Sequence, residues 1–101
     1  MGIKSSRSTT GTWTITGLIP GRPLYLVANT DVAAADSGFG YRVLTGANGG
    51  YSPNDTYVWS MHSDNTVLTA SPSSAIVFPF LTEVVINVTY CTSGVLVRAY
   101  Q

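Results

Sequence analysis

Residues 11–30 read GTWTITGLIPGRPLYLVANT and contain two runs of strand-forming residues on either side of a turn. In the first run, Thr12–Thr16, large apolar residues alternate with threonines, and this period of two is typical of a half-buried β-strand. The second run is Leu24–Ala28. Between them, Pro20 and Gly21 suit the central positions of a type II turn, because proline presets φ and glycine accepts the positive φ that follows. The segment therefore predicts an antiparallel hairpin or a tight corner between two sheets.

The rest of the chain repeats this succession of short strand-like runs and turn signals. Further strands are expected within residues 39–44, 56–62, 75–80, 82–89 and 95–100. About seven to eight short strands with no long helix predict an all-β fold, an antiparallel β-sandwich of jelly-roll or immunoglobulin-like type. The alternation of apolar residues along these runs predicts that the valine-rich segments lie in the core. It predicts the same position for four aromatic side chains: Trp13, Tyr41, Trp59 and Phe78.

The chain divides into two predicted parts. Residues 1–10 are polar and rich in serine and threonine, so we expect a flexible lead-in or the end of a linker. Residues 11–101 are expected to form a single β-sandwich domain, which suits a chain of 101 residues. The first residues lack the apolar segment of a secretory signal, and no run of about 20 apolar residues occurs, so neither a signal peptide nor membrane insertion is predicted.

The composition narrows the range of partners. Charged residues make up 10% of the chain and the net charge is zero, so no electrostatic field favours binding of nucleic acid. A weakly charged surface also resists self-association poorly, which favours an oligomer. Cys91 is the only cysteine. It excludes an intramolecular disulfide and a cysteine-rich metal site, and it suggests a buried, unreactive thiol.

The sequence contains few residues that could act in catalysis. His62 is the only histidine, and Asp64 lies two residues away. A nucleophile activated by histidine needs both groups beside a serine or cysteine, whereas a strand running into a turn favours a surface polar pair. The glycine-rich stretch Gly46–Gly50 lacks the lysine of a phosphate-binding loop. We therefore predict a non-enzymatic protein with no cofactor and no metal.

The candidate binding residues lie in the longest stretch of turn formers and in the polar pair that follows it. Aromatic rings stack on sugars, and amides and carboxylates bind their hydroxyl groups, so a tyrosine among such residues suits a carbohydrate surface. The same residues also suit an ordinary exposed loop. The predicted ligand-binding set is Asn48, Tyr51, Asn54, Asp55, His62 and Asp64.

The successive segments TWTITGLIPGRPLYLV, GYRVLTGANGG and a final LVRAYQ resemble the C-terminal domains of tail-fibre and related tail proteins of enterobacterial phages and prophages. The resemblance covers most of residues 11–101, and its most specific parts are the opening run and residues 97–101. It implies a virion component at the distal end of a tail appendage, synthesised in the host cytoplasm and acting outside the cell. Such domains are often homotrimers that bind a bacterial surface glycan or protein receptor or cap the fibre.

A second hypothesis is a carbohydrate-binding module of an extracellular protein. It requires a flat or grooved row of exposed aromatic rings, for which the sequence offers Tyr41, Tyr57 and Trp59. The two hypotheses share a glycan ligand and differ in the assembly that carries the domain.

Overall fold

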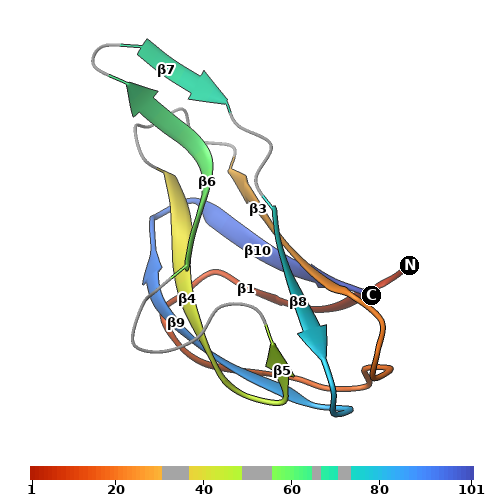
Figure 1. Ribbon diagram of the computed structural model, residues 1–101. Helices are drawn as coiled ribbons and strands as arrows, with labels where there is room; N and C mark the ends of the chain where they lie inside the picture. The colour runs from red at the N-terminus through yellow and green to blue at the C-terminus, as the bar shows by residue number, and fades with distance from the viewer. Residues whose placement is uncertain (31–36, 49–55, 65–66, 71–73) are drawn as a thin grey trace.

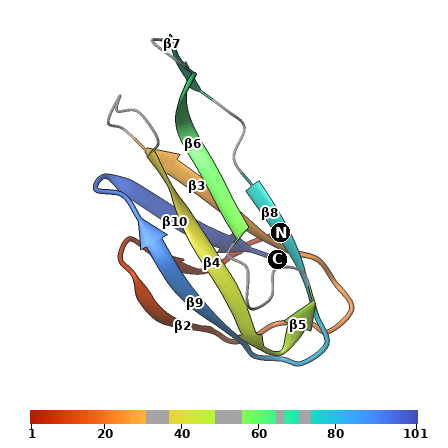
Figure 2. The ribbon, with the colours of Figure 1, turned by 60° about the vertical axis from the view of Figure 1, so that its left-hand side comes forward.

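The computed structural model describes residues 1–30, 37–48, 56–64, 67–70 and 74–101, with the backbone alone for residues 59–64 and 67–70. These residues form two antiparallel sheets that pack face to face, and no helix occurs among them (Figures 1 and 2). The described residues thus contain no helix that could cross a membrane. The predicted fold class, an antiparallel β-sandwich, is confirmed.

The described chain has ten strands, more than the seven or eight predicted, and β5 has only two residues. Each sheet contains five of them. Sheet A has the order β1 (Ile3–Arg7), β10 (Val95–Tyr100), β3 (Leu24–Thr30), β8 (Ser74–Pro79) and β5 (Ala47–Asn48). Sheet B has the order β2 (Gly11–Ile15), β9 (Val84–Cys91), β4 (Ser37–Thr45), β6 (Thr56–Asp64) and β7 (Val67–Ala70).

The turn predicted at Pro20 and Gly21 connects the two sheets. The N–H of Arg22 donates to the carbonyl of Ile19 at 3.3 Å, and Gly21 has a φ of 87°, as a type II turn requires. Because β2 belongs to sheet B and β3 to sheet A, the segment is a corner between sheets and not a hairpin.

Alternate side chains of both sheets face one another and form the core. Phe39 and Tyr41 stack with their ring centroids 5.6 Å apart. Trp13 and Tyr41 are buried as predicted, whereas Phe78 is 53% exposed. The prediction for Phe78 is wrong because Val77 and Pro79, its neighbours on β8, face the core and leave it on the outer side. The largest fully buried apolar side chains are Tyr41, Phe39, Ile15, Leu24, Leu26 and Ile86.

The prediction of a flexible lead-in is wrong for residues 3–7, which form β1 and pair with β10. Ser5 accepts a hydrogen bond of 2.8 Å from the indole Nε1 of Trp13. The guanidinium of Arg7 donates to the carbonyls of Thr9, Thr10 and Thr12 at 2.7, 2.6 and 3.0 Å. A strand at the edge of a sheet can pair through its backbone alone and needs no apolar side chains. The polar residues of β1 therefore lack the alternating apolar pattern by which the other strands were predicted.

Gln101 fastens the corner between β2 and β3 to sheet A. Its backbone exchanges hydrogen bonds of 3.1 and 3.0 Å with Gly2. Its side-chain Oε1 accepts from the N–H of Ile19 at 2.7 Å, and its Nε2 donates to the carbonyls of Ile19 and Arg22 at 3.0 and 3.1 Å. One side chain thus satisfies three backbone groups of the turn.

Gly46 closes the end of the sandwich between β4 and β5. Its φ is 90°, and its carbonyl accepts from the N–H groups of Phe80 and Leu81 at 2.9 and 3.3 Å. A Cβ at this position would meet the carbonyl oxygen of Glu83. Only glycine satisfies both the backbone angle and the close approach.

Candidate functional site

The predicted binding residues do not form one described patch. Asn48 is exposed on β5, in register with Phe78 of β8. His62 and Asp64 lie on β6, in register with β7, and only their backbone is described. The β6–β7 pair and β5 lie at opposite ends of the molecule (Figures 1 and 2). The remaining predicted residues, Tyr51, Asn54 and Asp55, fall outside the described residues.

Two tyrosines form an aromatic pair on the outer face of sheet B. Tyr57 is 50% exposed, and its ring meets that of Tyr90 edge to face, with a centroid separation of 6.0 Å and an interplanar angle of 65°. Tyr57 on β6 and Tyr90 on β9 are both in register with Gly40 on β4, the strand between them. The pair therefore spans three neighbouring strands.

Gly40 makes room for this arrangement. A Cβ at residue 40 would lie 2.7 and 2.9 Å from Cε1 and Cδ1 of the Tyr57 ring and 3.3 Å from the Cβ of Tyr90. The Tyr57 ring consequently lies directly over the glycine backbone. A glycine inside a strand weakens the strand, and its presence in β4 is explained by this close approach of an aromatic ring.

A β-bulge at Thr89 turns Tyr90 outward. Gly40 pairs with Tyr90, but the next residue of β4, Tyr41, pairs with Val88, so Thr89 is the extra residue of β9. Val88 faces the core, and an uninterrupted period of two would have placed Tyr90 there too. The buried Oγ1 of Thr89 makes no hydrogen bond within the described structure. The bulge thus moves a large aromatic side chain from the core face to the outer face.

Polar side chains continue the outer face beside the two rings. Arg42 follows Gly40 by two residues on β4, so both point to the same side of the sheet. Arg42 is in register with Asn87 of β9, and Asn87 with Thr12 of β2. Arg42 and Asn87 are half-buried and Thr12 is exposed. The tyrosine surface, as we name it, consists of Tyr57, Tyr90, Arg42, Asn87 and Thr12.

The sequence located only part of this surface. Tyr57 was one of the three aromatic residues proposed for an exposed row, and it is exposed. The prediction that Tyr41, the second, belongs to an exposed row is wrong. Tyr41 is 1% exposed and belongs to the core, because it lies on the inward face of β4. The side chain of Trp59, the third, lies outside the described structure. Tyr90 was not predicted from the sequence, and the only signal for the pair was a glycine between two aromatic residues of a strand, Phe39 and Tyr41.

Two ionisable groups of sheet B, on β4 and β9, have raised pKa values. Burial raises the pKa of the Tyr41 phenol, and a hydrogen bond with Thr56 partly offsets this effect. Burial likewise raises the pKa of the Cys91 thiol, and the positive charge of Arg7 partly offsets it. A raised pKa keeps the thiol protonated at neutral pH, so Cys91 is not an activated nucleophile.

These two groups predict a loss of stability at alkaline pH. Because folding raises both pKa values, the stabilisation is complete below the ordinary values of 9.0 for Cys91 and 10.0 for Tyr41 and is lost as pH rises through the folded-state values. Urea denaturation between pH 8 and pH 11 should show the free energy of unfolding falling above about pH 9. The double variant Tyr41→Phe, Cys91→Ala should show a smaller fall, and an equal fall would contradict the assignment.

The described side chains include no group of three or more His, Cys, Asp or Glu residues placed to hold a metal ion. Comparisons of the chain with protein-family models, with curated proteins and with solved structures gave no match.

Proposed function

We propose that this chain is a non-enzymatic domain of a phage or prophage tail fibre that binds a glycan of the bacterial surface through its tyrosine surface. The half-exposed ring of Tyr57, held over Gly40 beside Tyr90, is the observation that carries the proposal. Sugar rings present C–H groups that pack on such a ring. Their hydroxyl groups can pair with the guanidinium, amide and hydroxyl groups of Arg42, Asn87 and Thr12.

The geometry favours binding over catalysis. Tyr57 and Tyr90 lie on paired strands of sheet B, Tyr90 directly after the bulge at Thr89, so the sheet sets their backbone positions before a ligand arrives. Pre-positioned rings and polar groups on strands lower the entropy cost of recognition. The one described thiol, Cys91, is kept protonated by its surroundings.

Self-association as a homotrimer belongs to the same proposal. Four side chains form a row across the outer face of sheet A as successive strand partners: Ile3, Tyr100, Tyr25 and Ile76. Ile3 is 58% exposed and Ile76 is 45% exposed, and Phe78 follows on the same face of β8. Adjacent exposed apolar side chains of this kind mark contact surfaces. Since the row lies on sheet A, copies of the chain that meet there leave the tyrosine surface on sheet B accessible.

A carbohydrate-binding module of an extracellular protein would use the same tyrosine surface. The two hypotheses differ in the genes expected beside the coding sequence. A tail-assembly cluster supports the fibre domain, and a gene for a secreted glycoside-active enzyme that includes this chain supports the module.

The proposed glycan contact predicts a loss of binding in Tyr57→Ala. We expect binding to a panel of enterobacterial lipopolysaccharides and capsular glycans to fall about ten-fold, which corresponds to about 1.4 kcal/mol. Gly40→Ala should also weaken binding, because its Cβ displaces the Tyr57 ring. The matched control is Phe80→Ala, since Phe80 is 55% exposed and lies outside the tyrosine surface.

Circular dichroism should show all three variants folded. If Tyr57→Ala binds as tightly as Phe80→Ala, the tyrosine surface is not the binding site. Analytical ultracentrifugation of the unaltered chain tests the trimer separately, and a monomer at high concentration would contradict it.

A further inference from the structure

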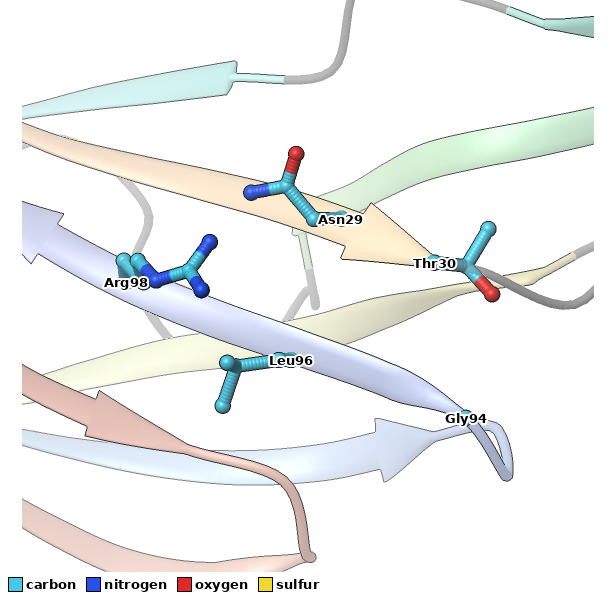
Figure 3. A pocket seen from close by; sticks show the side chains of 5 residues that line it. All are labelled: Asn29, Thr30, Gly94, Leu96 and Arg98. Atoms are coloured by element: carbon cyan, nitrogen blue, oxygen red, sulfur yellow. The ribbon is translucent and has the colours of Figure 1, made fainter.

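A second candidate site lies on the outer face of sheet A, away from the chain ends. A depression of about 330 Å³ is lined by Asn29, Thr30, Gly94, Leu96 and Arg98. Asn29 at the end of β3 is in register with Leu96 of β10, and Arg98 is two residues further along β10 on the same face. Figure 3 shows the Arg98 guanidinium and the Asn29 amide on neighbouring strands, with Leu96 beside them.

Two polar side chains of the depression, Arg98 and Asn29, are available to a ligand. Neither the Arg98 guanidinium nor the Asn29 amide makes a hydrogen bond or ion pair with any part of the chain that the structure describes. No acidic residue is among the five that line the depression. Arg98 is half-buried, as is common for an arginine whose aliphatic stem packs on a sheet.

The chemistry of the lining selects an anionic ligand with a polar ring. A guanidinium presents paired N–H donors that match the two oxygens of a carboxylate, and this pairing is about twice as strong as a neutral hydrogen bond. The Asn29 amide both donates and accepts, as a sugar hydroxyl does. Leu96 supplies an apolar wall, and the volume is near the lower end of small-molecule sites, about 300–1,000 Å³, which suits one sugar residue.

We propose that this depression binds a single acidic sugar residue, with its carboxylate on the Arg98 guanidinium and a ring hydroxyl on the Asn29 amide. The inference rests on the proposed function in one respect: the acidic sugar would be part of a bacterial surface glycan. The depression and the tyrosine surface lie on opposite sheets, so one domain contacts a glycan at two separate places. The apolar row on sheet A lies toward the chain ends, at Tyr25 and Tyr100, and Tyr100 is two residues from Arg98 on β10.

The test is a titration of the ¹⁵N-labelled full chain with D-glucuronate, D-glucose and acetate, followed by the backbone amide shifts. Glucuronate should shift the amides of the five lining residues with saturation in the millimolar range. Glucose, which lacks the charge, and acetate, which lacks the ring, should each bind about ten-fold more weakly, a difference of about 1.4 kcal/mol. Arg98→Gln should weaken glucuronate binding by a similar factor. The matched control is Lys4→Gln, which removes an equal charge from an exposed position on β1 of the same sheet.

Each outcome decides the proposal. Glucuronate shifts located elsewhere, undiminished binding in Arg98→Gln, or acetate binding as tightly as glucuronate would overturn it. Tyr57→Ala separates it from the proposed function, because that variant should keep the glucuronate shifts. Retained glycan binding in Tyr57→Ala with normal glucuronate shifts contradicts the tyrosine surface alone. If glucuronate causes no shifts but Tyr57→Ala still abolishes glycan binding, the proposed site in the depression is wrong and the tyrosine surface stands.

Discussion

Gly46→Ala is expected to lower the free energy of unfolding by more than about 4 kcal/mol, a loss found only where a substitution breaks a specific structural feature. The added Cβ would meet the carbonyl oxygen of Glu83, which is backbone and cannot turn aside. The φ of 90° adds about 1–2 kcal/mol of strain for any other residue. Moving Gly46 would also weaken the hydrogen bonds that its carbonyl accepts from Phe80 and Leu81. Urea denaturation followed by fluorescence of the buried Trp13 measures the loss.

The matched control is Gly17→Ala. Gly17 also has a positive φ, 71°, but nothing lies within 4 Å of the Cβ that alanine would add. This variant therefore carries the backbone strain without the clash, and we expect it to lose about 1–2 kcal/mol. Equal losses in the two variants would show that the contact with Glu83 is relieved at no cost.

Gln101→Ala is expected to lower the free energy of unfolding by about 2 kcal/mol. It removes three side-chain hydrogen bonds to Ile19 and Arg22, each contributing about 0.5–1.5 kcal/mol, and water recovers part of the loss because the turn is exposed. Amide hydrogen exchange should quicken at Ile19, whose N–H donates to the Gln101 Oε1. Unchanged stability together with unchanged exchange at Ile19 would show that the corner holds without this side chain.

Gln101→Glu separates the donor from the acceptor. Glutamate keeps the side-chain length and one acceptor oxygen, but it places a second oxygen opposite the carbonyls of Ile19 and Arg22. We expect a loss at least as large as in Gln101→Ala at pH 7. Because those carbonyls favour the protonated acid, the folded-state pKa of the new carboxyl is raised. The lost stability should therefore return as pH falls through this raised pKa, and it should be fully restored below the unfolded-state value of about 4.3.

Local features of the fold were predictable because they depend on neighbouring residues. The turn at Pro20 and Gly21 follows from the conformational limits of those two residues, and the inward face of β4 follows from the alternation around Phe39 and Tyr41. Whether the turn made a hairpin or a corner was not predictable, because that depends on which strands each run meets. The same holds for β1, whose partner β10 lies at the other end of the sequence.

The tyrosine surface was harder to predict, and the reason is physical. Tyr90 faces outward only because Thr89 is inserted as a bulge, and a bulge shifts the side-chain period by one residue without a signal in composition. The prediction that Phe78 lies in the core failed for a different reason. Its run, residues 75–80, is apolar on both faces, so hydrophobicity could not distinguish the core side from the outer side.

The position of β10 has a consequence for biosynthesis. β10 lies between β1 and β3, which both precede it in the sequence, so these two strands have no partner between them until residues 95–100 have emerged from the ribosome. A nascent chain stalled before that point would leave the backbone edge of β3 that pairs with β10 open to other chains. Sheet A can therefore be completed only after residues 95–100 have been translated, because β1 joins the other strands through β10.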